Sequence, residues 1–243
     1  MNMIETRDLT KRYGDKIAVD HLTFEVREGE LFSLLGVNGA GKTTTIRMLS
    51  CLSAPTAGEA WINGLNCASQ SAAVKQIIGI SPQDTAVADH LTVRENLEFM
   101  AAVYGLDEAA RRERTEKMLH DFRLGEVERQ RAKTLSGGWK RKLSIAMALI
   151  SEPRVLFLDE PTLGLDVLAR RELWHALEAL KGKMTIVLTT HYMEEAEHLS
   201  DRLAIMLSGR IVAGGTVAEL LALSGQDTLE NAFVAIAEKE DAR

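Results

Sequence analysis

Cysteine is scarce in this chain, as are aromatic residues and long apolar runs. Only Cys51 and Cys67 occur among 243 residues, and their spacing fits neither a disulfide framework nor a metal site. We therefore expect them to be buried or neutral thiols of a reducing compartment. The longest stretch without a charged residue, 60–74, contains Asn, Ser and Gln, whereas a membrane span needs about 20 mostly apolar residues. The charged first eleven residues predict no secretory signal, so we expect a soluble polypeptide.

An excess of basic charge is also lacking. The chain has 29 Lys and Arg against 35 Asp and Glu, a formal net charge of −6. A protein that wraps nucleic acid would be expected to carry a basic footprint, so no nucleic-acid partner is predicted. With 46% apolar and 26% charged residues the composition is that of a globular protein, and we expect a single domain over 1–243.

Strand and helix patterns alternate along the chain. Alternating or continuous apolar residues predict strands at 4–9, 21–26, 31–35, 155–158, 184–190 and 202–207. Helices are expected at 43–52, 142–150 and 170–180, which implies an α/β fold with a mostly parallel sheet. From about 85 to 150 the pattern is mainly helical, and Thr92 with Glu95 forms a capping-box sequence. We interpret 85–150 as an inserted helical lobe.

A glycine-rich loop follows the buried strand at 31–35. Residues 36–43 fit the G-x-x-x-x-G-K-[ST] pattern between a strand and a helix. Its backbone N–H groups and the helix N-terminus would bind phosphate oxygens, Lys42 would reach the β- and γ-phosphates, and the Thr43 hydroxyl would bind Mg²⁺. The expected ATP-binding residues here are Gly36, Asn38, Gly39, Ala40, Gly41, Lys42, Thr43 and Thr44.

Two acidic residues end the apolar strand at 155–158. Asp159 and Glu160 are thereby expected at the carboxyl edge of the sheet, where open α/β sheets bind ligands. Asp159 suits Mg²⁺ coordination, and Glu160 would orient or deprotonate the attacking water. Ser136, Gly137 and Gly138 precede another apolar helix and form a second anion-binding loop. One triphosphate does not need both loops unless the second serves the nucleotide of a neighbouring chain.

This arrangement resembles the ATP-binding cassette (ABC) ATPases over almost the whole chain. The resemblance implies a P-loop NTPase core with an N-terminal antiparallel β region, the helical lobe, and a short C-terminal helix or tail at 225–243. Tyr13 matches the aromatic residue that stacks on adenine, and Gln83 matches the glutamine that joins the Mg²⁺ site to the lobe. Asp166 matches the loop that crosses the dimer interface, and His191 matches the histidine near the γ-phosphate. Catalysis is thereby assigned to Glu160, His191 and Gln83.

One departure from the family pattern lies at the end of the second loop, where Trp139 stands in place of the frequent Gln. Trp139 either stacks on the partner's ribose or packs against its own lobe. The basic run 140–142 either raises the potential near the neighbour's phosphates or is solvated. The amphipathic segment 228–236 either docks on its own domain or makes a regulatory or dimer contact.

The implied function is ATP hydrolysis by a head-to-tail dimer that drives a separate membrane permease. Segments 89–97, 104–106 and 229–233 resemble the exporter branch that handles drugs, lipids or polysaccharides. The chain is then expected in the cytoplasm, bound to the inner face of the cell membrane through the permease. Substrate specificity would lie in that permease, and the dimer is either a homodimer or a heterodimer of cassettes.

Two other classes compete with the transporter interpretation. A soluble ABC ATPase of DNA repair usually has a long coiled coil between the two loops, and 43–136 is too short for one. The translation types usually carry two cassettes per chain, and the acidic balance disfavours both. A kinase-like phosphoryl transferase would have no use for the loop at 136–138.

Overall fold

The chain forms two compact units. The computed structural model describes residues 2–241, so Met1 and the last two residues of the predicted tail lie outside the described residues. The first unit consists of the chain up to Gln76 together with the part from Lys181 onward, and the second of Ile77–Leu180.

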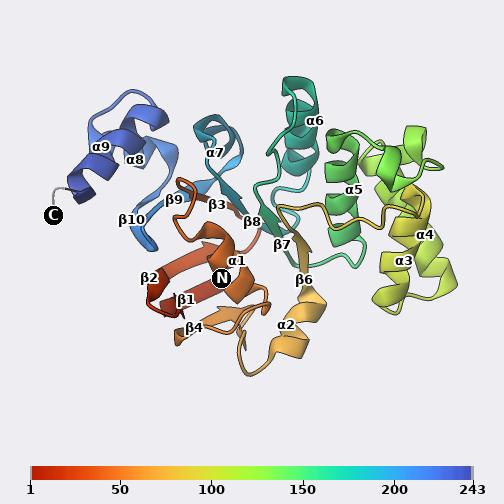
Figure 1. Cartoon of the computed structure of the whole chain (residues 1–243), viewed down its shortest axis with the longest axis horizontal. Coiled ribbons are helices and arrows are strands. Elements are labelled where there is room, and N and C mark those ends of the chain that lie inside the picture. The colour runs from red at the N-terminus through yellow and green to blue at the C-terminus, as the bar shows by residue number, and fades with distance from the viewer. Residues whose placement is uncertain (1, 242–243) are drawn as a thin grey trace. The chain divides into compact units, whose positions relative to one another are not determined.

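The first unit contains an antiparallel sheet built from the N-terminal segment (Figure 1). Its strands are, in spatial order, β2 (Lys16–Arg27), β1 (Asn2–Tyr13), β4 (Ala57–Ile62) and β5 (Leu65–Asn66). Ile4 pairs with Val26 on one side and with Ile62 on the other, and all three side chains are buried. The expected strands at 4–9 and 21–26 are therefore parts of longer strands that cover a buried apolar face.

A second sheet in the first unit contains the strand that leads into the glycine-rich loop. The strand β3 (Leu31–Leu35) runs parallel to β8 (Thr185–Thr190) and β9 (Arg202–Leu207), and β10 (Arg210–Gly215) is antiparallel to β9. All five residues of β3 are buried, as expected for a central parallel strand covered on both faces. The predicted strand at 31–35 is confirmed.

The helices of the first unit are α1 (Lys42–Leu49), α7 (Met193–Leu199), α8 (Val217–Ser224) and α9 (Leu229–Asp241), and α2 (Ser71–Ile77) runs to its boundary. The helix α1 ends earlier than the predicted 43–52, because Cys51 adopts a left-handed conformation with φ 58°. The C-terminal helix docks on its own unit, as the first alternative predicted. Its Leu229, Phe233 and Ile236 pack in one cluster with Leu203 and Ile205 of β9.

The second unit is mainly helical. Its two strands, β6 (Ile78–Ser81) and β7 (Val155–Asp159), are parallel. Its helices are α3 (Val93–Val103), α4 (Glu108–Asp121), α5 (Gly137–Leu149) and α6 (Val167–Glu178), with short 3₁₀ turns at Leu124–Val127 and Ala132–Thr134. The helices α3, α4 and α5 pack side by side (Figure 1). The helix α5 begins five residues before the predicted 142, because Ser136 already caps it.

Among residues 2–241, no helix combines the length and the apolar character needed to cross a bilayer. The two thiols lie near one carbonyl: the Sγ atoms of Cys51 and Cys67 are 3.8 and 3.5 Å from the oxygen of Leu49. The pKa of the Cys67 thiol is raised well above its ordinary value, mainly by hydrogen bonding to Cys51 and to a lesser extent by burial. Cys67 is therefore the buried, neutral thiol that was expected, whereas hydrogen bonding from Cys67 lowers the pKa of the half-buried Cys51.

Candidate functional site

The glycine-rich loop connects β3 to α1 in the first unit. The N–H of Gly36 donates to the oxygen of Thr190 at 3.2 Å, so the loop starts beside the end of β8. A Cβ atom on Gly36 would lie 2.3 Å from the oxygen of Met206, and Gly41 has φ 104°. The loop therefore follows a path that only glycine allows at these two positions.

Lys42 lies within this loop. It is 4% exposed, and its Nζ donates to the oxygens of Gly36 at 2.7 Å and Val37 at 3.1 Å. The ammonium group is thus held against carbonyl oxygens of the loop whose N–H groups the pattern assigns to phosphate binding. Of the other predicted residues, Asn38 and Gly39 are exposed, Ala40 is buried, and Thr43 and Thr44 are half-buried.

His191 and Tyr13 also belong to the first unit. His191 follows the last residue of β8, so the contact between Gly36 and Thr190 brings the start of the loop near this histidine. The imidazole ring is half-buried, with its centroid 4.1 Å from that of Tyr192. Tyr13 ends β1, is 48% exposed, and has the Nζ of Lys11 5.1 Å from its ring centroid. An exposed ring of this kind is available for stacking.

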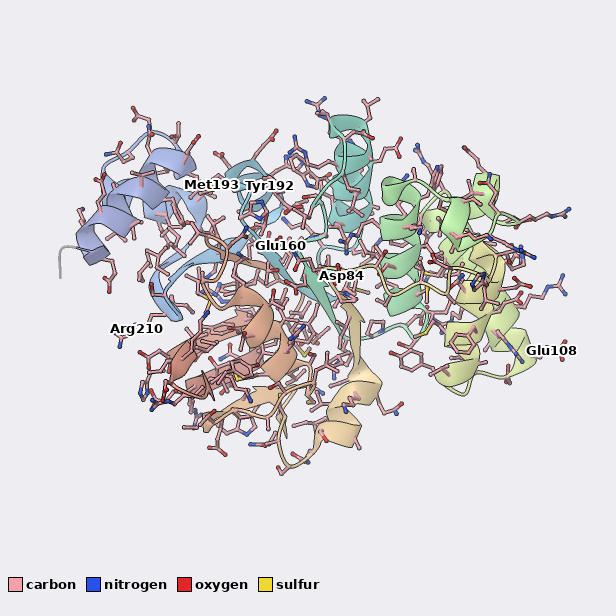
Figure 2. The ribbon with its side chains drawn as sticks, in the orientation of Figure 1. Asp84, Glu108, Glu160, Tyr192, Met193 and Arg210 are labelled. Carbon is pink, nitrogen blue, oxygen red and sulfur yellow. The ribbon has the colours of Figure 1, made fainter. Side chains whose placement is uncertain are left out.

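The predicted acidic pair lies at the end of β7 in the second unit. Asp159 is 4% and Glu160 6% exposed, and Figure 2 labels Glu160 at this strand end. Glu160 has φ 48°, an unusual conformation for a residue other than glycine and one that is enriched at functional sites. The Nε2 of Gln83 donates to its Oε2 at 3.3 Å. The structure thus brings together two residues that are 77 positions apart and that the sequence assigned to catalysis.

The second anion-binding loop forms the N-terminus of α5. Ser136 and Gly137 are exposed, and the Ser136 Oγ accepts from the N–H of Trp139 at 3.5 Å. A Cβ atom on Gly138 would be 3.1 Å from the Cβ of Ala169, so the loop lies against the first turn of α6. Asp166 caps α6 through bonds of 2.9 Å from the N–H groups of Leu168 and Ala169. Its capping role explains why the sequence has Asp there without excluding a contact to a second chain.

One alternative for the basic run 140–142 was that its side chains are solvated. This is wrong for Arg141 and Lys142, which are buried. Arg141 is 4% exposed and donates to the carbonyl oxygens of Pro82 and Gln83. Lys142 is 7% exposed; it donates to Glu172 and lies 4.6 Å from the ring centroid of Trp139. Lys140 pairs with Asp89 at 3.1 Å.

Sequence reasoning missed Arg141 because no spacing pattern connects it to residues 82–83. In the sequence, Arg141 has the same pattern as the basic residues on either side of it. Its burial in the structure distinguishes it from Lys140. Trp139 is half-buried and is held on its own helix by Lys142, which favours packing within the lobe over stacking on a partner's ribose.

Comparison with known proteins places these loops in a family. The family model for "ABC transporter" matches residues 19–163. The chain is 40% identical over 238 residues to the "Probable multidrug ABC transporter ATP-binding protein YbhF" of Escherichia coli (strain K12), covering 96% of this chain and 41% of that protein. It is 42% identical over 221 residues to the "Daunorubicin resistance ATP-binding protein DrrA3" of Streptomyces coeruleorubidus, covering 90% of this chain and 70% of that protein.

Two solved structures show the same fold. The "ATP binding subunit of ABC transporter" superimposes with a TM-score of 0.87 at 33% identity, over 97% of this chain and 99% of that chain. A "post-hydrolysis state of the ATP-binding cassette MJ0796 bound to ADP and Pi", described as dimeric, gives a TM-score of 0.80 at 25% identity, over 88% and 98%. The predicted α/β fold with an antiparallel N-terminal sheet is confirmed. The chain belongs to the ABC transporter family and has the fold of its ATP-binding cassettes.

Proposed function

We propose that this chain binds and hydrolyses ATP and thereby drives a separate permease subunit, in an exporter. The observation that carries the proposal is the Glu160 carboxylate, 6% exposed at the end of β7 and held by the Gln83 amide at 3.3 Å. A buried carboxylate oriented by a neighbouring amide is suited to orient a water molecule and accept its proton. The chain is proposed to act as a single nucleotide-binding domain over 1–243, with the lobe at 85–150 and the tail at 225–243.

Phosphate binding is assigned to the glycine-rich loop. The N–H groups of 36–43 and the N-terminus of α1 supply partial positive charge, and Lys42 adds a full one. We assign the γ-phosphate and the attacking water to His191 and the adenine to Tyr13. The ATP-binding set is completed by Thr44 and, across a dimer, by Ser136, Gly137, Gly138 and Asp166.

Mg²⁺ fits the donors that this assignment provides. The hydroxyl of Thr43, the amide oxygen of Gln83 and the carboxylate of Asp159 are all oxygen donors, which Mg²⁺ prefers. When bound, the ion would neutralise charge on the transferred phosphoryl group. Lys42 and the Ser136 hydroxyl contribute to the same electrostatic stabilisation, while Glu160 takes the proton of the attacking water.

A head-to-tail dimer would bring one chain's loop 36–43 to the other chain's loop 136–138. Support comes from exposure: Ser136 and Gly137 are exposed, and so are Leu163, Val167 and Leu168 around Asp166, with Leu168 at 74%. Exposed apolar side chains beside an exposed anion-binding loop suit a surface that closes on a second copy. The MJ0796 cassette, which is described as dimeric, supports the formation of a dimer. A homodimer and a heterodimer would use the same contacts.

The transport part of the proposal comes from the relatives. Their names speak of multidrug transport and daunorubicin resistance, which supports export. The chain spans 41% of the length of YbhF and 70% of the length of DrrA3, so their transport activity comes to this chain only as a proposal. We propose that this chain is held at the cytoplasmic face of the cell membrane by its permease, and that no nucleic acid is bound.

Glu160→Gln tests the hydrolysis and the dimer together. The amide cannot accept the proton, so turnover should fall by about 10²-fold or more while ATP binding remains. Size-exclusion chromatography with ATP and Mg²⁺ should then show a stable dimer. Hydrolysis at the parental rate would contradict the role of Glu160. Capture of this variant from detergent-solubilised membranes tests the partner: a stoichiometric polytopic protein supports the transporter, whereas ribosomes or DNA-processing proteins point to a soluble motor.

A further inference from the structure

A buried arginine connects the helix of the second anion-binding loop to the peptide that carries Gln83. Arg141 lies in the second turn of α5 and is 4% exposed. Its Nη1 donates to the oxygen of Pro82 at 2.7 Å, and its Nη2 donates to the oxygen of Gln83 at 2.5 Å. A planar guanidinium group with two donors on two successive carbonyls fixes both the position and the orientation of that peptide.

The residue that precedes this peptide is held by the same helix. The Oγ atoms of Ser81, at the end of β6, and Ser144, one turn beyond Arg141 on α5, are 2.9 Å apart. The proline ring restricts φ at 82, so little backbone freedom is left before Gln83. The hydrogen bonds that hold this segment fall on Ser81, Pro82 and Gln83, and the next residue, Asp84, is exposed (Figure 2).

While the Gln83 carbonyl is bound by Arg141, the Gln83 side-chain Nε2 donates to the Oε2 of Glu160 at 3.3 Å. Because the side chain is exposed, packing alone would not hold the amide in place. The order of contacts therefore runs from α5 through Arg141 to the Gln83 backbone, and from the Gln83 amide to the Glu160 carboxylate.

Arg94, another arginine of the unit, is bound differently. It donates to two carboxylates, Glu116 at 2.8 Å and Glu128 at 2.8 Å, so its role is to join α3 to the neighbouring elements by ion pairs. It contacts neither Gln83 nor Glu160 in these bonds. Arg94 is therefore a matched control: an arginine of the same unit with two hydrogen-bonded partners but no contact to the Gln83 peptide.

We propose that Arg141 is a positioning residue for ATP hydrolysis: it acts through the Gln83 backbone to hold the Gln83 amide on Glu160. The inference rests on the proposed function for its effect on turnover, although its effect on the peptide does not depend on it. Since Ser136 caps the same helix, Arg141 also connects the Gln83 peptide to the helix that begins in the second anion-binding loop.

The activity test compares Arg141→Met, Arg141→Lys and the control Arg94→Met in the full chain. Arg141→Met should lower kcat by about tenfold or more, because small misplacements of catalytic groups are costly, with the KM for ATP within about twofold. It should also raise the Mg²⁺ concentration needed for half-maximal activity. Arg141→Lys should recover part of kcat, because one ammonium can still reach a carbonyl. Arg94→Met should keep kcat within about twofold.

A double-mutant cycle separates positioning from general loss of structure. In a Gln83→Ala background, Arg141→Lys should change kcat by less than about twofold, because the amide on which it acts is gone. Equal effects of Arg141→Lys with and without Gln83 would overturn the proposal. The lysine variant retains charge and length, so this cycle remains valid if the methionine variant fails to fold.

Amide hydrogen exchange supplies a readout without turnover. In Arg141→Lys, the backbone amides of 83–85 should exchange faster, while those around Thr92 stay as in the parent. Unchanged exchange at 83–85 would overturn the inference even if activity falls. Conversely, a parent chain that does not hydrolyse ATP, or a fully active Glu160→Gln variant, would contradict the proposed function and leave the exchange result to decide the role of Arg141.

Discussion

The two glycine-containing loops, 36–43 and 136–138, differ in what their glycines do for the fold. In the first loop, a Cβ atom on Gly41 would lie 2.4 Å from the oxygen of Ala18, and φ is 104°. Gly36 is equally constrained by the oxygen of Met206. The backbone of the first unit therefore requires these glycines, whether or not a phosphate is bound.

The glycine at 137 has no such internal reason. It lies at the start of α5, and its φ is not positive. Apart from its chain neighbours and the backbone of its own helix, no atom of the described residues lies within 4 Å of the place a Cβ would take. Glycine in a helix lowers stability by up to about 1 kcal/mol relative to alanine. A residue that weakens its own helix and relieves no contact within the chain points to a close approach from outside it. This supports a second chain's nucleotide at 136–138.

Gly41→Ala should have the largest effect, on stability and binding together. The contact with the Ala18 backbone and the left-handed φ should lower the free energy of unfolding by about 3 kcal/mol. Urea denaturation measures it. Gly39→Ala is the control, because Gly39 has φ 84° but open space around it, so only the backbone strain of about 1 kcal/mol is expected. Equal losses for both variants would contradict the contact argument.

Gly137→Ala should separate function from stability. The free energy of unfolding should stay the same or rise by up to about 1 kcal/mol, since alanine favours the helix. ATP-dependent dimer formation and turnover should fall by about tenfold or more if a phosphate approaches this backbone. Denaturation, size-exclusion chromatography with ATP, and ATPase assays give the three values. Parental turnover with parental dimer formation would contradict the assignment of 136–138 to a partner's nucleotide.

Features made by neighbouring residues could be predicted from the sequence, whereas contacts between distant residues could not. The loop 36–43 is contiguous, and its glycines, lysine and threonine follow from the backbone path and from phosphate chemistry, so its strand, loop and helix were predicted. The family resemblance assigned Gln83 to the Mg²⁺ site and the lobe, but its contact with Glu160 joins two strand ends that are far apart in the sequence and was not predicted. Arg141 could not be predicted, because a buried arginine bound to backbone carbonyls leaves no pattern in a run of basic residues.

The predicted start of α5 was wrong for a local reason. The helix α5 was expected to begin at 142 because its apolar residues start there, yet Ser136 caps it and Gly137 already has helical geometry. The predicted capping box at Thr92 is confirmed, since its Oγ1 accepts from the N–H of Glu95 at 3.2 Å and the Glu95 Oε2 accepts from the N–H of Thr92 at 2.7 Å. A reciprocal Thr and Glu pair is a more specific sequence pattern than a lone serine cap followed by two glycines.

The smallest expected effect compares these two caps. Thr92→Ala should lower the free energy of unfolding by about 1 kcal/mol, and Ser136→Ala by about half as much, because the Ser136 bond is longer at 3.5 Å and is not reciprocated. Turnover should respond in the opposite order: Ser136→Ala should reduce it, and Thr92→Ala should not. If turnover followed stability instead, the Ser136 hydroxyl would be only a cap.

The pH dependence of the two stability losses sharpens the same comparison. Hydrogen bonds from Thr92 hold the pKa of Glu95 below its ordinary value, so the stabilisation is present above that ordinary value and is lost as the pH falls through the lowered pKa. The loss caused by Thr92→Ala should therefore shrink as the pH falls below about 4.3, the ordinary pKa of a glutamate. The loss caused by Ser136→Ala should stay constant, because the first turn of α5 has no acidic residue. Urea denaturation at pH 7 and at successively lower pH measures both losses of unfolding free energy. If the two losses changed with pH in parallel, Glu95 would not contribute to the Thr92 cap.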